Sequence, residues 1–241
     1  MNKSLKLFLG ISYLIILFVF LYFIFSYVEV TRLDDFVYYK ELQENLERIT
    51  SKNIYLDLLI FFSFCIIWIS LLGFGTPLLI ISGIIFGKWL GTFISVISIS
   101  IGATILYSIA SFFFKELVQS LFKEKFNKYI DLFTRNEFNY FFAFRLAGGL
   151  GIPFGLQNIL PVIFKIKRVN YFFASLFGFV PMFFIWNTVG SGLNKYIREA
   201  ENFSIINLIL SKEIYVPIIL FAGMLIVSGI IKKKMFDDKS K

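Results

Sequence analysis

The apolar stretch between residues 54 and 114 constrains the fold more than any other part of the sequence. Its 61 residues carry two charged side chains, Asp57 and Lys88, and contain no polar connection long enough for an ordinary loop. One straight helix of that length would be roughly three bilayer cores long, at about 1.5 Å of rise per residue. The chain must therefore turn, and its helix breakers lie at residues 73–77 (GFGTP) and 87–91 (GKWLG). The predicted elements are a spanning helix over 54–72, a re-entrant segment over 74–90 and a second long helix to 114.

The composition assigns the whole chain to the membrane. Of its 241 residues, 58% are hydrophobic and 17% are charged, and the mean hydropathy is +0.78. A soluble domain has about a quarter of its residues charged, so a soluble enzyme, a disordered chain and a secreted disulfide scaffold are excluded. The sequence has no histidine and a single cysteine, Cys65. Histidine catalysis and a thiolate metal cluster are thereby ruled out, and no acid, base and nucleophile converge in the sequence. We therefore expect a non-enzymatic protein without cofactor or metal.

The charge distribution predicts the partners and the orientation. The net charge of +8 comes from 24 basic and 16 acidic residues. In a membrane chain, basic residues near helix ends set the orientation and contact anionic lipid, so we expect membrane lipids as partners and no nucleic acid. Lys3 and Lys6 precede the first apolar stretch and Lys232–Lys234 follow the last, which predicts that both termini are cytoplasmic. The Phe-, Ile-, Lys- and Asn-rich composition indicates a bacterial plasma (inner) membrane, and a homo-oligomer is left open.

Other stretches complete the predicted topology. Both termini on one side require an even number of crossings, so either residues 138–164 cross as a broken helix or another span is miscounted. The remaining predictions are spans over 7–28, 169–190 (kinked at Gly178 and Pro181) and 214–231, an external amphipathic helix within 29–53, and a partly helical hydrophilic connection over 115–137.

The predicted fold is an all-α polytopic integral membrane protein with about five to six transmembrane helices. Two re-entrant, broken helical hairpins are expected to form an inverted repeat. The predicted divisions of the chain are 1–53 (first helix and amphipathic segment), 54–192 (core with both hairpins) and 193–241 (last helix and basic tail).

Two glycine–proline motifs suggest this repeat. The pattern G-x-G-x-P occurs at residues 73–77 and again, 76 positions on, at 149–153. From each proline the next shared glycine lies 25 positions on, at Gly102 and Gly178. Segments interrupted by Gly and Pro at matching places in two halves are typical of repeat-built transporters with a site at the midplane. The alternative is coincidence, because Gly and Pro are frequent in membrane helices generally.

Arg145 is the sharpest candidate for a functional residue. A guanidinium within an apolar stretch costs at least about 2.5–3.5 kcal/mol at mid-membrane on insertion scales, so it usually faces a cavity or a partner. The glycines Gly148, Gly149 and Gly151 expose backbone N–H groups, and a helix starting near Pro153 would direct its positive end to the same place. This combination suits an anion such as a lipid phosphate. The alternative is that Arg145 extends to the membrane interface.

Further residues are candidates for the same substrate site. Lys88, at the tip of the first hairpin, is either a second phosphate contact or an interfacial anchor beside Trp89. Gln157 and Asn158 offer neutral donors and acceptors for a headgroup, or else bond neighbouring helices. Gly75 and Pro77 belong to the matching break in the first half. The row Gly83, Gly87 and Gly91 indicates close helix packing.

Acidic residues are scarce in the apolar regions. Residues 54–114 contain Asp57 alone, and residues 138–190 contain no acid. Proton-coupled transport usually needs a carboxylate or histidine within the membrane, so a proton antiporter is weakly supported.

Three segments carry a family resemblance. They are PLLIISGIIFGKWLGTFISVISISIGA (77–103), FFAFRLAGGLGIPFGLQN (141–158) and GFVPMFFIWNTVG (178–190). In this order they resemble the DedA/VTT-domain family, also called SNARE-associated Golgi proteins, over about residues 70–192. The resemblance implies two facing re-entrant hairpins, and several members are linked to lipid scrambling or to flipping of lipid-phosphate carriers. Its motif matches are Arg145, Pro153, Phe154 and Asn158, at the second hairpin.

The chain departs from the family pattern at two points. The family spaces its arginine and prolines as R-x-x-P-x-x-P, whereas Gly148 stands at the first proline position and Pro153 comes two positions late. The hairpin acids of the DedA branch are also missing, which leaves proton coupling and the specific substrate open.

Together these features predict a protein that transports, flips or scrambles an anionic lipid, either a phospholipid or a polyprenyl phosphate. Two alternatives stay open. One is a transporter of a small solute or ion, and the other is a non-transporting membrane organiser whose glycine rows pack helices or recruit a partner.

Overall fold

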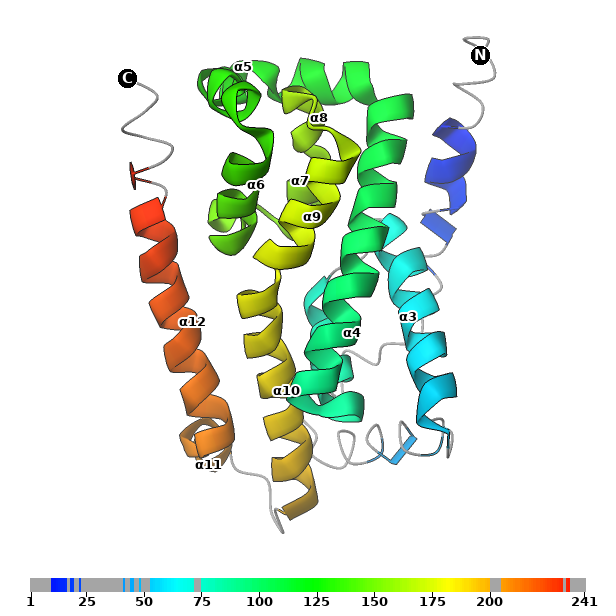
Figure 1. The fold of residues 1–241 in the computed structure, drawn as a ribbon. Helices are drawn as coiled ribbons and strands as arrows, with labels where there is room; N and C mark the ends of the chain where they lie inside the picture. Colours follow the sequence, from blue (N-terminus) through cyan, green and yellow to red (C-terminus); the bar gives the residue numbers. More distant parts are fainter. Residues whose placement is uncertain are drawn as a thin grey trace.

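The computed structural model describes residues 10–16, 18, 19, 22, 41, 44, 45, 48, 53–71, 75–199, 205–231, 233 and 234. The described part is all-helical, as predicted, and contains no strand. Figure 1 shows most helices running side by side along one direction, with α5 (Lys115–Arg135) lying across one end of the bundle. Most of the predicted first span over 7–28 and of the amphipathic segment over 29–53 lies outside the described residues.

The first half begins with α3 (Ile54–Ser70), close to the predicted span over 54–72. The side chain of Asn53 caps this helix by accepting a hydrogen bond of 3.1 Å from the Tyr55 backbone N–H. The helix packs along α4 (Gly75–Phe113), where Gly102 lets the backbones come close. A Cβ on Gly102 would lie 2.9 Å from the Cβ of Ile69, so a side chain there would force the helices apart.

The helix α4 reverses its direction at Gly87. This glycine has φ 72° and ψ 177°, a backbone conformation that is accessible essentially to glycine alone. The Ser82 hydroxyl donates a hydrogen bond of 3.1 Å to the carbonyl oxygen of Gly91, although a straight helix would separate these residues by roughly 13 Å. The arm 75–86 therefore folds back along the arm 88–113, and the predicted turn within 87–91 is confirmed.

The second half reverses its direction as well. It consists of α6 (Glu137–Leu146), the 3-10 turn η2 (Gly148–Gly151), α7 (Phe154–Ile159) and α8 (Pro161–Phe164). The ring of Phe133 in α5 stacks on Phe164 at 4.1 Å between centroids and lies 6.1 Å from the ring of Tyr140. Both ends of the segment thus meet α5, so residues 138–164 form a hairpin, and the alternative in which they cross as a broken helix is wrong. The cause is the turn at 148–151, where four consecutive residues have positive φ.

A long bent helix follows this hairpin. It is formed by α9 (Arg168–Gly178) and α10 (Val180–Glu199), which meet at 45°. The kink predicted at Gly178 and Pro181 is confirmed, although the helix continues to Glu199, beyond the predicted end at 190. The short helix α11 (Ile205–Leu210) lies in the stretch between the last two predicted spans, and α12 (Lys212–Ile231) matches the predicted last span.

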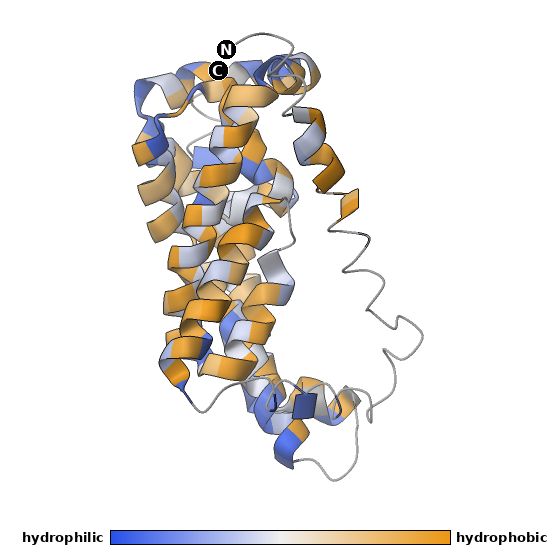
Figure 2. Cartoon of the chain, turned by 90° about the vertical axis from the view of Figure 1, so that its right-hand side faces the viewer, coloured by the Kyte–Doolittle hydropathy of each residue, from blue (hydrophilic) through white to orange (hydrophobic). Residues whose placement is uncertain are grey.

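Two of the described helices are long and apolar enough to cross a membrane, α4 and α12, and the bent pair α9–α10 gives a third when it counts as one span. Figure 2 shows hydrophobic residues along the length of the bundle and hydrophilic residues gathered toward its two ends. The outward face of α12 carries exposed Ile219, Leu225 and Ile226, which suits contact with lipid. The total of five to six spans stays a prediction.

The arm 75–86 and α10 pack almost backbone to backbone. A Cβ on Gly83 would overlap the backbone of Asn187, and a Cβ on Gly190 would overlap the backbone of Ile80. Gly91 likewise approaches the Asn187 side chain, so the packing role predicted for Gly83 and Gly91 is confirmed. Gly87 of the same row makes the turn instead.

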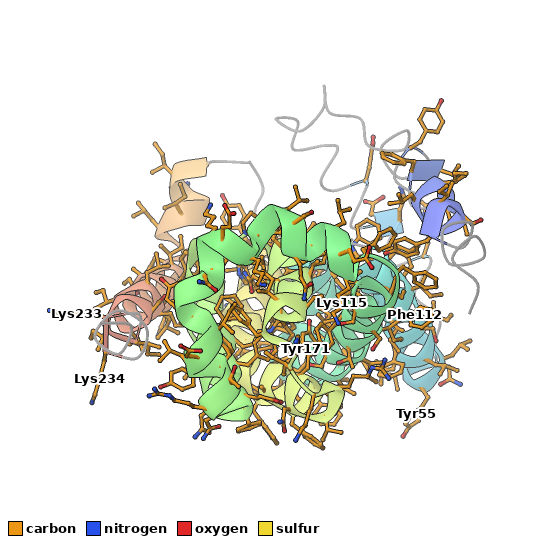
Figure 3. All side chains as sticks on the ribbon, turned by 90° about the horizontal axis from the view of Figure 1, so that it is seen from above. Tyr55, Phe112, Lys115, Tyr171, Lys233 and Lys234 are labelled. Atoms are coloured by element: carbon orange, nitrogen blue, oxygen red, sulfur yellow. The ribbon has the colours of Figure 1, made fainter. Side chains whose placement is uncertain are left out.

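The helix α5 covers one end of this core. Val118, Leu132 and Phe133 are buried on its inner face, while its lysines with described side chains are exposed. Figure 3 views this end from above and shows α5 passing over the ends of the hairpin helices. The predicted partly helical connection over 115–137 is thus a continuous 21-residue helix.

Candidate functional site

Arg145, in the last turn of α6, is buried at the centre of the second hairpin, with 1% of its surface exposed. Its side chain is held inside the protein and does not extend to the interface, so that alternative is wrong. The guanidinium makes four hydrogen bonds: Nε to Ser175 Oγ (3.2 Å), Nη1 to Gln157 Oε1 (3.4 Å), and Nη2 to Asn158 Oδ1 (2.7 Å) and Tyr171 Oη (2.7 Å).

Every hydrogen-bond partner of this guanidinium is neutral. Within the described part of the chain, no ion pair involves Arg145. Three aromatic rings surround its Cζ atom, with centroids at 4.7 Å (Phe141), 5.3 Å (Tyr171) and 4.6 Å (Phe179). Ring faces and amide or hydroxyl dipoles stabilise a cation without cancelling its charge. The site therefore keeps a full positive charge inside the helical bundle.

The turn after α6 is joined to this charge by Gln157. The Gln157 amide donates from Nε2 to the carbonyl oxygens of Gly148 (3.2 Å) and Ile152 (2.6 Å), while its Oε1 accepts from Arg145. The backbone of Gly149 has φ 75°, and a Cβ there would overlap the Gln157 side chain. The glycines of the second motif thus shape a left-handed turn that orients the group beside Arg145.

Two hydrogen-bond partners of Arg145, Tyr171 and Ser175, were not predicted from the sequence. We call Arg145 and its hydrogen-bond partners the charge network. Tyr171 and Ser175 lie four positions apart in α9, so they share one face of that helix and both reach Arg145. The Tyr171 hydroxyl also lies 3.3 Å from Asn158 Oδ1, which closes the network. A polar pair at helical spacing within an apolar segment was the available signal.

Gly75 of the first G-x-G-x-P motif and Phe154, directly after the second, meet beside Arg145. A Cβ on Gly75 would lie 3.4 Å from the ring of Phe154, so the start of α4 contacts the start of α7. A cavity of about 250 Å³ opens between them, with walls from α4, the second hairpin, α10 and α12. Its lining includes Gly75, Thr76, Arg145, Gly148, Phe154, Gln157, Phe179, Met182, Trp186 and Phe221.

The predicted site residues divide into three groups. Gly75, Arg145, Gly148 and Phe154 line the cavity, while Gly149 and Asn158 are buried just behind its wall. Pro77, Gly151 and Pro153 belong to the two motifs but are exposed and do not line the cavity. Lys88 is not brought to Arg145: it lines a separate hollow of about 510 Å³ with Lys195, Lys212 and Glu213.

The comparison with protein families identifies this architecture. The VTT domain matches residues 72–192, which is half of the chain. The chain belongs to the VTT-domain family, the DedA/SNARE-associated Golgi protein family. No solved structure matches the chain. The VTT domain contains α4 to α9 and most of α10, and therefore both motifs and Arg145.

Helix α12 lies outside the VTT domain and completes the site. Phe221 of α12 lines the cavity and lies 5.9 Å from the ring of Trp186. The Ser228 hydroxyl donates a hydrogen bond of 2.8 Å to the carbonyl oxygen of Ala147, at the start of the turn. The last helix thus packs directly on the hairpin that carries Arg145.

Proposed function

We propose that this VTT-domain protein moves an anionic lipid across the bilayer, with the headgroup passing the cavity beside Arg145. One observation carries the proposal: a buried guanidinium with neutral partners lies in the wall of a cavity where two broken segments meet. A phosphate that enters this cavity finds a cation that no carboxylate of the described chain neutralises.

The geometry of the guanidinium supports an anionic cargo. An arginine side chain has five N–H groups, and the four hydrogen bonds of Arg145 leave one N–H on Nη1 for a ligand. Hydrogen bonds from a charged donor to a phosphate oxygen are roughly twice as strong as neutral ones. An unaided phosphate would lose its hydration in hydrocarbon, so a hydrogen-bonding path lowers its barrier.

The size of the cavity favours a headgroup over a whole lipid. Its volume of about 250 Å³ is below the ~300 Å³ at which pockets for drug-sized ligands begin. The headgroup would occupy the cavity while the acyl or prenyl chains stay in the bilayer. Phospholipid and polyprenyl phosphate both satisfy this condition.

The proposal includes that the two halves of the core are related as an inverted repeat. Gly102 carries the contact of α4 with α3, and a Cβ on Gly178 would lie 2.5 Å from the Cβ of Arg145 in α6. Each glycine lies where a long helix crosses the arm that precedes it. This equivalence supports alternate opening of the cavity toward the two membrane surfaces.

Reconstitution into liposomes tests the proposal. Purified protein in vesicles with a labelled anionic phospholipid or polyprenyl phosphate should accelerate transbilayer movement. Arg145→Gln removes the charge and should lower the rate by about tenfold, a loss of about 1.4 kcal/mol of barrier stabilisation. Arg135→Gln, at the exposed end of α5, is the matched control and should keep the wild-type rate. An Arg145→Gln protein that folds and moves lipid as fast as wild type would refute the role of Arg145.

A second measurement separates the alternative functions. The same vesicles are loaded with a small fluorescent anion, and its release is followed. Release without lipid movement would indicate a small-solute transporter and contradict lipid transport. If neither lipid nor anion moves, while the folded protein still clusters its partners, the protein is a membrane organiser.

A further inference from the structure

A basic hollow opens at the end of the bundle that α5 covers. It has a volume of about 540 Å³ and lies between the end of α4, the start of α5 and the turn from α8 to α9. Lys115, Lys165, Lys167 and Arg168 provide its charged lining, and we call these four residues with their cavity the basic hollow. All four side chains are exposed to the outside of the protein.

The cations of the basic hollow have no acidic partners among the described residues. No ion pair of Lys115, Lys165, Lys167 or Arg168 occurs there. The nearby carboxylate of Glu137 is engaged by backbone and amide donors, since its Oε2 accepts from the Lys167 N–H and from Asn170 Nδ2, each at 2.9 Å. Four like charges around one cavity repel one another, so a polyvalent anion is the ligand that stabilises them.

The basic hollow is connected to Arg145 by two tyrosines. Tyr107 lines the hollow, and its hydroxyl donates a hydrogen bond of 2.6 Å to the carbonyl oxygen of Ile166. The ring of Tyr107 stacks on Tyr171 with centroids 4.5 Å apart and planes 7° from parallel. The Tyr171 hydroxyl in turn accepts from Arg145. Lys115 and Tyr171 accordingly lie near each other in the view along the bundle in Figure 3.

We propose that the basic hollow binds a phosphate group at the membrane surface and is the docking site of the headgroup on this side of the protein. The role in transport depends on the proposed function, whereas phosphate binding by the hollow does not. Lysine and arginine side chains near a membrane surface attract anionic lipid. The site is exposed, so its affinity should fall as the salt concentration rises.

Equilibrium binding to the purified full-length protein in an uncharged detergent tests this proposal. The probes are dioctanoyl phosphatidic acid and inorganic phosphate. The triple variant Lys165→Gln, Lys167→Gln, Arg168→Gln should bind the lipid at least about tenfold more weakly than wild type. The matched control Lys123→Gln, Lys233→Gln, Lys234→Gln also removes three exposed charges and should stay within about twofold of wild type.

The outcomes distinguish the hollow from the transport site. Arg145→Gln should move lipid about tenfold more slowly than wild type and keep binding at the basic hollow. Thermal unfolding checks that the hollow triple variant is folded. If the folded variant binds lipid like wild type, the basic hollow is not the docking site. Equal weakening in the control would reduce the effect to net charge, and binding of inorganic phosphate without the lipid would assign the hollow to a soluble anion; either result overturns the docking role. Binding that depends on the hollow in a protein that moves no lipid supports the hollow and contradicts the proposed function alone.

Discussion

The side-chain amide of Gln157 occupies the space that a Cβ atom on Gly149 would need. The Nε2 of this amide donates a hydrogen bond of 2.6 Å to the Ile152 carbonyl oxygen in the turn, and its Oε1 accepts one of 3.4 Å from Arg145 Nη1. The backbone of the glycine motif and the orientation of the guanidinium therefore depend on one side chain. A change at either residue should be detectable at both places.

Gly149→Ala should destabilise the protein more than Gly151→Ala does. Both glycines have positive φ, 75° and 80°, which costs an alanine about 1–2 kcal/mol. Only the Cβ at 149 overlaps Gln157; at 151 no atom lies within 4 Å. The displaced amide should add about 1–3 kcal/mol. Thermal unfolding in detergent measures the difference, and equal melting temperatures would contradict the coupling.

Tyr171→Phe should weaken the charge network without altering the helix. The substitution removes the hydroxyl that accepts from Arg145 Nη2 at 2.7 Å and leaves a buried N–H with one acceptor fewer. We expect a loss of about 1–3 kcal/mol in the free energy of unfolding, which denaturant titration measures. Tyr215→Phe, on a residue that is 40% exposed, is the control and should stay near wild type. A Tyr171→Phe protein as stable as wild type would show that the network contributes little.

Gly83→Ala should separate the arm 75–86 from α10. Its Cβ would overlap the backbone of Asn187, which cannot move without shifting a helix, and overpacking of this kind costs about 1–3 kcal/mol. Gly223→Ala places a Cβ in open space on α12 and should be neutral or slightly stabilising. Melting temperatures of the two variants measure the difference. A Gly83→Ala protein that melts at a higher temperature than Gly223→Ala would contradict close packing at this crossing.

Gly87→Ala should disturb the reversal of α4. With φ 72° and ψ 177°, this position imposes about 1–3 kcal/mol of strain on any residue with a side chain, although no atom lies within 4 Å of its Cβ position. The adjacent Lys88 is exposed, so limited digestion with trypsin should cleave faster after Lys88 in the variant. Gly229→Ala, with no neighbour within 4 Å and an ordinary helical backbone, is the control. Unchanged cleavage would argue against a strained turn.

The breaks of the fold could be predicted from the sequence, because Gly and Pro act locally. Gly87 and the 148–151 turn lie where an apolar segment had to stop being helical. The direction of the chain after 148–151 was not predictable in the same way, since a break does not reveal on which side the chain continues. Here the contacts of Phe133 with Tyr140 and Phe164 decided it, and they depend on tertiary packing.

The candidate site was predicted in part for a similar reason. Arg145 stands out because a charge in an apolar segment needs an explanation, whereas Tyr171 and Ser175 are ordinary residues of membrane helices. Their role depends on how α9 is rotated toward α6, which the close approach of Gly178 to Arg145 determines. Lys88 failed as a partner because the reversal at Gly87 carries it away from Arg145, into the hollow with Lys195 and Lys212.

The neutral surroundings of Arg145 have a consequence for selectivity. Arginine does not deprotonate in proteins, so the cavity wall holds the same charge at every physiological pH. With no carboxylate of the described chain to form a competing pair, a site that moves lipid as proposed would discriminate by the sign of the charge of its cargo and little by its chemical detail. Under the proposed function, such a site would admit many kinds of anionic headgroup and turn away cationic ones.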